Sequence, residues 1–97
     1  MLTFTIITCT YNASQYIDRT LDSVLRQTYP HIDHLIIDGM SKDNTVEKAK
    51  KYAEMESPHS IRIICEKDKG LYDAMNKGID LSVGHFLIFL NAGDTFA

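Results

Sequence analysis

Residues 2–39 read LTFTIITCTYNASQYIDRTLDSVLRQTYPHIDHLIIDG, and they contain the patterns of a strand, a helix and a second strand in that order. The first strand is predicted at residues 2–8, which are β-branched and apolar. Apolar residues then recur at helical spacing at Ile17, Leu21, Val24 and Leu25. Tyr29-Pro30 ends this helix because the residue before a proline avoids the α region. The second strand is predicted at residues 35–37, so the stretch forms one strand-helix-strand unit.

The rest of the sequence continues the alternation. A second helix is predicted from Thr45 to Met55 with Asp43 as its N-cap. A third strand follows at residues 61–65, then a third helix that ends near Gly84, then a fourth strand at residues 86–90. The order βαβαβαβ predicts an α/β fold, an open parallel sheet with helices on both faces. A chain of 97 residues is long enough for one domain and too short for two.

The composition is that of a globular protein without a basic surface for nucleic acid. Hydrophobic residues make up 44% and charged residues 24%, and both values are ordinary for a globular domain. The net charge of −3 argues against a nucleic-acid-binding protein, because neutralising phosphates requires clustered Lys and Arg. No apolar run approaches the roughly 20 residues of a membrane-spanning helix. No signal peptide is visible at the N-terminus.

Cysteine and histidine show no pattern of a metal or disulfide site. Cys9 and Cys65 form no CxxC pair, and we expect buried or half-buried free thiols, which suit a cytoplasmic protein. Histidines lack ligand spacing on a common element, so we expect them at the surface or in loops. They are His31, His34, His59 and His85.

The predicted fourth strand differs from the others in its position near the end of the chain. Every residue from 86 to 90 is apolar, which is typical of a strand with neighbours on both sides and both faces covered. Only a few residues follow it, and an apolar edge strand invites pairing with another chain. We therefore expect its missing neighbour in sequence that is not present, or in a second copy of the chain.

Polar segments follow every predicted strand. Ligands of an open parallel sheet bind beyond the carboxyl ends of the strands. These ends are predicted at residues 8–12, 38–39, 68–70 and 91–94, so their side chains converge at one edge. No G-x-G-x-x-G motif follows the first strand, which disfavours the usual dinucleotide fold, and the absence of G-x-x-x-x-G-K-[ST] excludes a P-loop.

Individual residues at this edge have two interpretations each. Asp94 could bind Mg²⁺ or Mn²⁺ together with substrate phosphates, or only form a turn. Asp38 could accept the imide N–H of a uracil-like base, or form an Asx turn. Asp73 lies in the first turn of the third helix, which the helix dipole favours for any carboxylate. Lys69 could contact phosphate or be solvated.

Several motifs together resemble family 2 glycosyltransferases. Two are especially similar to that family: residues 38–45, Asp-Gly-Met-Ser-Lys-Asp-Asn-Thr, and residues 68–78, Asp-Lys-Gly-Leu-Tyr-Asp-Ala-Met-Asn-Lys-Gly. Residues 8–12, 27–30 and 90–94 also match, so the resemblance covers essentially the whole chain. It implies the A-type nucleotide-binding α/β fold and an inverting, metal-dependent transfer from a nucleotide sugar. The closest motifs are those of the subgroup that makes bacterial capsules and exopolysaccharides.

The resemblance implies a role for several residues. Its nucleotide-binding positions are Thr10, Tyr11, Asn12, Asp38, Lys69, Asp73 and Lys77. Among them, Asp38 matches the aspartate that recognises uracil, and Asp73 and Lys77 border the sugar-diphosphate pocket. Asp94 matches the metal-binding aspartate of the D-x-D-like element, with Mg²⁺ or Mn²⁺ as cofactor.

The sequence also departs from the family. Asn91 and Gly93 stand where the family often has aspartate, which predicts weak metal binding without nucleotide. Met40 replaces the usual Gly or Ser, which predicts an altered backbone. Family members are more than twice as long, and their acceptor site and catalytic base follow the D-x-D element. Residues 1–97 are therefore expected to be an N-terminal donor-binding part without its acceptor part.

These observations leave alternatives for the function. The first is a glycosyltransferase fragment that uses a UDP-sugar and, in the full-length enzyme, a saccharide or lipid-linked acceptor. The second is a non-catalytic nucleotide-binding or assembly module with the same fold. A phospho-acceptor signalling domain is disfavoured because no acidic pair follows the first strand. We expect a cytoplasmic protein, in solution or at the inner face of the membrane.

Overall fold

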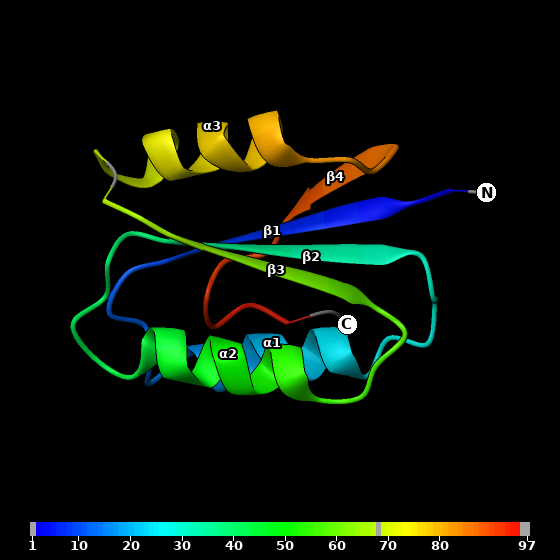
Figure 1. The fold of residues 1–97 in the computed structure, drawn as a ribbon, viewed down its shortest axis with the longest axis horizontal. Helices are drawn as coiled ribbons and strands as arrows, with labels where there is room; N and C mark the ends of the chain where they lie inside the picture. The colour runs from blue at the N-terminus through cyan, green and yellow to red at the C-terminus, as the bar shows by residue number, and fades with distance from the viewer. Residues whose placement is uncertain (1, 68, 96–97) are drawn as a thin grey trace.

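The computed structural model describes residues 2–67 and 69–95. Its strands are β1 (Phe4–Thr10), β2 (Ile32–Asp38), β3 (Ser60–Cys65) and β4 (Phe86–Phe89). Its helices are α1 (Ile17–Leu25), α2 (Thr45–Glu54) and α3 (Leu71–Leu81). All strand pairs are parallel, in the order β3-β2-β1-β4 (Figure 1). The predicted α/β fold is confirmed. None of the described helices has the length and apolar character that crossing a membrane requires.

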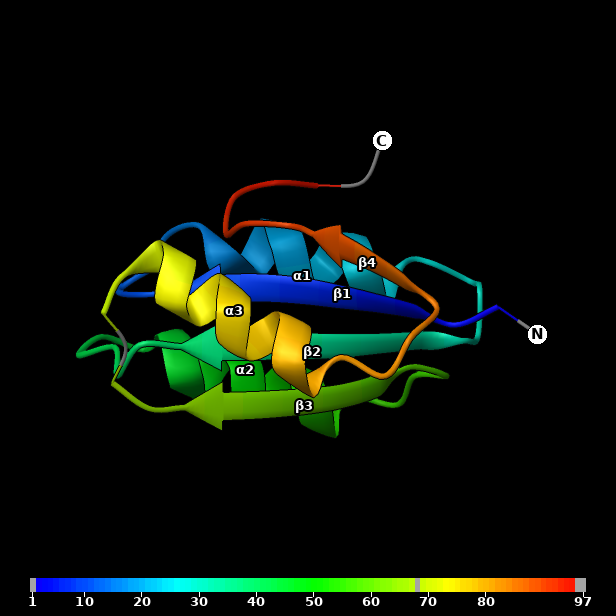
Figure 2. The same ribbon diagram turned by 90° about the horizontal axis from the view of Figure 1, so that it is seen from above.

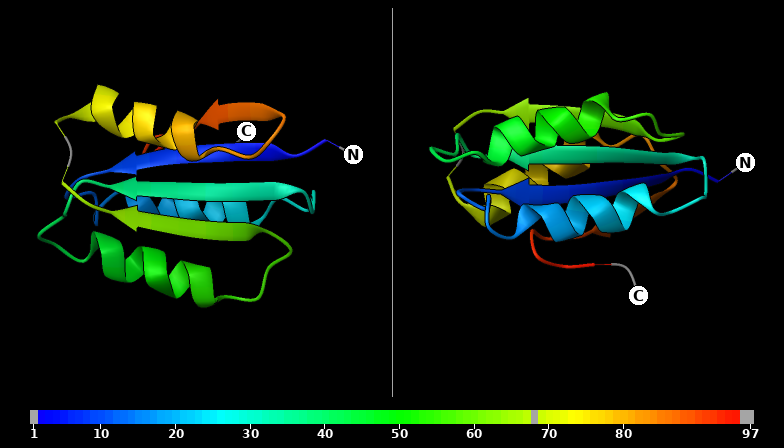
Figure 3. Two further views of the ribbon diagram at one scale, coloured as in Figure 1. Left: turned by 45° about the horizontal axis from the view of Figure 1, so that its top comes forward. Right: turned by 90° about the horizontal axis from the view of Figure 1, so that it is seen from below.

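Helices cover both faces of the sheet. α1 and α2 pack on one face and α3 on the other (Figures 1 and 3). Ile6 of β1 belongs to the core toward α1 and α2, whereas Ile7 belongs to the core toward α3. Successive side chains of a strand point to opposite faces, so both faces of this central strand are buried. This explains why every residue of the neighbouring strand β2, its polar ones included, is buried.

β4 lies at an edge of the sheet. Among the described residues it pairs only with β1, and α3 lies over β1 and β2 beside it (Figure 2). Phe86 is 49% exposed, Leu87 is 40% exposed and Phe89 is 37% exposed. Within the described residues β4 therefore lacks a second neighbour, as the sequence analysis expected, and the source of that neighbour stays a prediction. The apolar side chains of β4 remain in contact with solvent.

Gly84 does not end α3, as the sequence suggested. The helix ends at Leu81, and Gly84 lies closer to β4, where its N–H donates to Thr5 Oγ1 at 2.8 Å. A Cβ at position 84 would lie 2.6 Å from the backbone nitrogen of Thr5 and 2.9 Å from the carbonyl oxygen of Thr3. Glycine is needed here because the chain passes close to the backbone of β1.

The positions of one histidine and one cysteine also differ from the predictions. His34 is fully buried in β2, and His59 is 8% exposed. The prediction of surface or loop histidines is wrong for His34, which has polar partners inside the protein. Cys9 is half-buried as expected, but Cys65 is exposed.

Candidate functional site

The carboxyl ends of β1, β2 and β3 meet at one edge of the sheet, as the parallel order requires. Backbone hydrogen bonds continue past the strands, from Gly39 N to Thr10 O at 3.0 Å and from Glu66 N to Asp38 O at 3.0 Å. Thr10, Asp38 and Cys65 are neighbours in register across the three strands. The loops that leave this edge therefore start from fixed positions.

Asp38 is the centre of a hydrogen-bonded cluster at this edge. Its Oδ1 accepts from the hydroxyls of Thr10 at 2.7 Å and Ser41 at 2.6 Å. Its Oδ2 accepts from Ser41 N at 2.8 Å and from Cys65 Sγ at 3.6 Å. The residue is 1% exposed. Because a carboxylate has about four acceptor positions, all of them are used by the protein's own donors. Recognition of a base by Asp38 stays a prediction, and it requires one of these donors to move away.

The loop after β1 and the loop after β2 are joined by side chain to backbone bonds in both directions. Asn12 N donates to Ser41 Oγ at 2.8 Å, and Lys42 N donates to Asn12 Oδ1 at 2.8 Å. Asn12 has φ 49° and Met40 has φ 65°, so both residues adopt the left-handed conformation. Met40, which stands where the family usually has Gly or Ser, therefore occupies a backbone conformation that favours glycine. Hydrogen bonds thus hold the two loops together.

Asp43 joins the loops a second time. Its Oδ2 accepts from Ser14 N at 3.1 Å, and its Oδ1 accepts from Thr45 N at 3.0 Å and from the Thr45 hydroxyl. The Thr45 hydroxyl is the first of the contacts that hold the pKa of this exposed carboxyl down at about 2. The N-cap position of α2 is Asn44, whose side chain makes no capping bond. Asp43 therefore caps α2 as predicted, but from the position before the N-cap residue.

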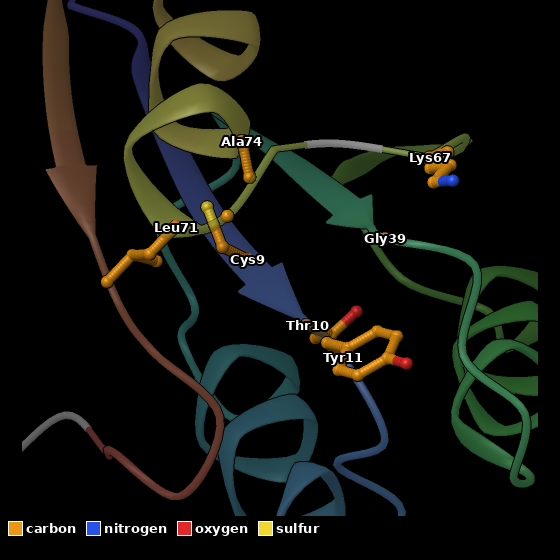
Figure 4. A pocket seen from close by; sticks show the side chains of 8 residues that line it. Cys9, Thr10, Tyr11, Gly39, Lys67, Leu71 and Ala74 are labelled. Carbon is orange, nitrogen blue, oxygen red and sulfur yellow. The ribbon is translucent and has the colours of Figure 1, made fainter.

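A cavity of about 420 Å³ opens between the ends of β1 and β2 and the start of α3 (Figure 4). Ligand sites in proteins have volumes of ~300 to 1,000 Å³. The cavity contains two of the predicted residues, Thr10 and Tyr11, and Tyr11 is 59% exposed. Of its other lining residues, Cys9, Gly39 and Gly70 fall within segments predicted to converge at this edge, whereas Lys67, Leu71 and Ala74 were not singled out from the sequence. Two apolar side chains of α3 among them show that one wall is apolar.

Three further predicted residues lie before or within α3 and do not line the cavity. Asp73 Oδ2 accepts from Lys69 N at 2.9 Å, and this bond is the main reason why the pKa of the Asp73 carboxyl is lowered. Lys77 Nζ lies 3.6 Å from Asp73 Oδ2 and donates to Lys67 O at 3.0 Å. These contacts hold the loop before α3 in place. Asp68, the first residue of the matching motif, lies outside the described residues.

Asp94 lies in a tight turn after β4. Asp94 N donates to Asn91 O at 2.9 Å, and Gly93 supplies φ 97°. Asn91 N in turn donates to Asp94 Oδ2 at 3.2 Å, and the Asp94 side chain is exposed.

The donor chemistry of this turn fits a weakly held divalent cation. Mg²⁺ keeps several waters and is often bound by one or two carboxylates plus substrate phosphates. Asp94 offers one such carboxylate. No group of three or more His, Cys, Asp or Glu side chains that could hold a metal occurs in residues 2–67 and 69–95. The site thus fits a metal that is bound jointly with a ligand.

The sequence of this chain is similar to those of known proteins. A family described as Glycosyl transferase family 2 matches residues 5–97. A PGL/p-HBAD biosynthesis glycosyltransferase of Mycobacterium tuberculosis is 39% identical over 92 residues, 95% of this chain and 36% of its own length. TuaG of Bacillus subtilis, whose name places it in teichuronic acid biosynthesis, is 33% identical over 89 residues, 92% of this chain and 35% of its own. The chain thus spans about a third of these curated relatives.

Solved structures share the fold. TarS 1–349 of S. aureus in complex with UDP-GlcNAc superposes with a TM-score of 0.87 at 23% identity, covering 97% of this chain and 27% of that chain. The mannosyltransferase PcManGT of Pyrobaculum calidifontis, in complex with GDP-Man and Mn²⁺, has a TM-score of 0.90 at 23% identity over 98% of this chain and 28% of that one.

Proposed function

The chain belongs to glycosyl transferase family 2, and on that premise we propose that it forms the nucleotide-sugar-binding part of a glycosyltransferase of polysaccharide biosynthesis. The observation that carries this proposal is the cavity of about 420 Å³ beside two loops that are already held together. A preorganised site loses less entropy when a ligand binds. The names of the relatives and the nucleotide sugars bound to the structural neighbours support the same function.

The proposed donor is a UDP-sugar. Tyr11 offers an exposed aromatic ring at the mouth of the cavity, against which a base can stack. The proposed nucleotide-binding set is that implied by the family: Thr10, Tyr11, Asn12, Asp38, Lys69, Asp73 and Lys77. Thr10, Asn12 and Asp38 would act by holding the two loops in place, because the side chains of Thr10 and Asn12 bind Asp38 and Lys42 N. Lys69 lies near Asp73 at the start of α3 and brings a positive charge for the diphosphate.

The proposed cofactor is Mg²⁺ or Mn²⁺ held by Asp94. Such an ion would supply electrostatic stabilisation of the departing diphosphate. The chain's own contribution is a carboxylate whose direction is set by the Asn91 N–H. Mn²⁺ in the complex of PcManGT supports the choice of metal.

Transfer itself requires more than residues 1–97. We infer a saccharide or lipid-linked acceptor and a catalytic base in the full-length enzyme, which works in the cytoplasm or at the inner face of the membrane. No base can be assigned to a residue of this chain. The purified chain is therefore expected to bind the donor without transferring its sugar, and sugar transfer by this chain in a product assay would contradict that expectation.

Titration of UDP into the purified chain tests the proposal. Calorimetry with and without Mn²⁺ is expected to show UDP binding that Mn²⁺ strengthens. Asp94→Asn is expected to reduce this Mn²⁺-dependent increase in UDP affinity at least ~10-fold, or ~1.4 kcal/mol. Asp80→Asn, at an exposed carboxylate of α3, serves as the matched control and should bind like the parent. A folded parent chain that binds no UDP under either condition would refute donor binding.

We also propose that β4 mediates self-association of this chain. Its outer edge is unpaired among the described residues, and its apolar side chains are exposed. Such an edge can pair with the same strand of a second copy. Sedimentation analysis is expected to show a concentration-dependent dimer that Leu87→Lys abolishes. Val83→Lys, at an exposed residue outside the strand, should leave the dimer intact. A parent chain that stays monomeric at all concentrations would exclude this contact.

A further inference from the structure

One buried side chain of α1 binds three backbone groups of the turn at residues 91–94. Thr20 is fully buried. Its Oγ1 donates to Asp94 O at 2.7 Å and lies 3.2 Å from Asn91 O, and it accepts from Gly93 N at 2.8 Å. These partners are 71 to 74 residues away along the chain.

The contacts use the hydroxyl both as a donor and as an acceptor. A threonine hydroxyl has one proton to donate and two lone pairs to accept with. The proton is shared between the two carbonyls, with Asp94 O the nearer, and one lone pair receives the Gly93 N–H. A helical threonine commonly bonds to a carbonyl of the preceding turn of its own helix. Thr20 instead uses its hydroxyl on a distant turn.

Among the residues that the structure describes, the turn has few other hydrogen bonds to the protein. Leu90 N donates to Ile7 O at 3.0 Å, and beyond that point the bonds of the turn within residues 2–67 and 69–95 are internal ones, Asp94 N to Asn91 O and Asn91 N to Asp94 Oδ2, apart from those to Thr20. A Cβ built on Gly93 would have only Tyr16 Cβ within 4 Å, at 3.7 Å. Thr20 is thus the side chain that connects the turn to α1.

We propose that Thr20 is a positioning residue that fixes the Asn91–Asp94 turn and, through it, the metal-binding carboxylate of Asp94. The metal role of Asp94 rests on the proposed function; the positioning of the turn rests on the contacts of Thr20 alone. Asp94 is held at its backbone oxygen by Thr20 and at its carboxylate by Asn91 N. The direction of the carboxylate therefore follows the position of α1.

Two substitutions separate the hydroxyl from the shape of the side chain. Thr20→Val keeps the β-branched shape and removes the hydroxyl, whereas Thr20→Ser keeps the hydroxyl. Thr8→Val is the matched control, because Thr8 is another fully buried threonine and its hydroxyl binds His34 instead of the turn. Thermal unfolding of each variant reports the general loss of stability.

The first measurement needs no metal. Amide hydrogen exchange of Gly93, followed by NMR, is expected to be about 10-fold faster in Thr20→Val. Thr20→Ser and Thr8→Val should exchange like the parent. Equal exchange of Gly93 in Thr20→Val and the parent would overturn the proposal, and so would a Thr20→Ser variant that behaves like Thr20→Val.

The second measurement follows the metal. Free Mn²⁺, observed by electron paramagnetic resonance in the presence of UDP, is expected to give a Kd about 10-fold higher for Thr20→Val. Thr20→Ser should restore the parent's value, and Thr8→Val should keep it even if its melting temperature is lower. Loss of Mn²⁺ binding in Thr8→Val equal to that in Thr20→Val would count against positioning. A parent chain that binds no Mn²⁺ with UDP would refute the metal role of Asp94. The hydrogen exchange of Gly93 would then be the only test of whether Thr20 positions the turn.

Discussion

Between pH 7 and pH 4, His34 alone is expected to lower the free energy of unfolding by about 3 kcal/mol. Burial is the main cause that lowers the pKa of His34 from 6.5 to about 3, and the nearby His59 adds to it. The unfolded chain therefore binds a proton near pH 6.5, whereas the folded chain resists it until about pH 3. The stability due to neutral His34 is present above pH 6.5 and is lost as the pH falls through this window.

The surroundings of His34 explain why its neutral form is favoured. Nε2 lies 2.8 Å from Thr8 Oγ1, and Nδ1 lies 2.8 Å from the hydroxyl of Tyr52. Hydroxyls can donate or accept, so they satisfy a neutral ring with either tautomer. No carboxylate is among these partners, and the register places Ile6 and Ile61 beside the ring on the neighbouring strands. A charged imidazolium would thus be buried without a counter-ion.

Urea unfolding of the parent and His34→Gln at several pH values isolates this contribution. The parent is expected to lose about 1 kcal/mol more per pH unit than the variant between pH 6 and pH 4. His85→Gln, at an exposed histidine, should keep the slope of the parent. Equal slopes for the parent and His34→Gln would contradict the expectation. If His34→Gln does not fold, NMR titration of the parent decides, because the His34 ring signals should not shift down to pH 4.

The buried histidine marks a limit of the sequence-based prediction. Alternating strands and helices were predicted correctly because hydrophobic periodicity is local. The partners of His34 are 26 and 18 residues away, at Thr8 and Tyr52. A polar residue in an apolar strand pattern is compatible with burial only when such partners exist, and their presence depends on the packing of α2 against the sheet.

The candidate site was predictable only in part, for a related reason. The rule that ligands bind beyond the carboxyl ends of parallel strands led to Thr10 and Tyr11, which line the cavity. Leu71 and Ala74 contribute apolar surface from α3, and nothing in their sequence distinguishes them from core residues of that helix. The bonds that saturate Asp38 come from three separate segments, so its availability could not be judged from the sequence.

Replacing Asp38 by asparagine is expected to lower the free energy of unfolding by about 2 kcal/mol. It is also expected to weaken the binding of different nucleotides by similar factors. Four donors now face the Asp38 carboxylate. An asparagine offers one acceptor oxygen and places a donor on the other side. If its oxygen receives Ser41 N, its NH₂ group faces the two hydroxyls, whose protons then lose their acceptor. Leaving buried donors unsatisfied costs about 1–3 kcal/mol. Asp22→Asn, at an exposed ion pair with Arg26, should change stability by less than about 1 kcal/mol.

The affinities for UDP and CDP distinguish two roles of Asp38, one in which it holds the loops in place and one in which it binds the base directly. Uracil presents an imide N–H where cytosine presents an acceptor, so a carboxylate that reads the base directly would favour UDP. Because Ser41 also accepts from Asn12 N, loss of the Asp38 contacts should disturb both loops of the site and reduce the affinities for UDP and CDP by similar factors. We therefore expect Asp38→Asn to leave the ratio of the two Kd values unchanged while stability falls. A ratio that changes at least ~10-fold with unchanged stability would instead establish that Asp38 releases its own donors and binds the base.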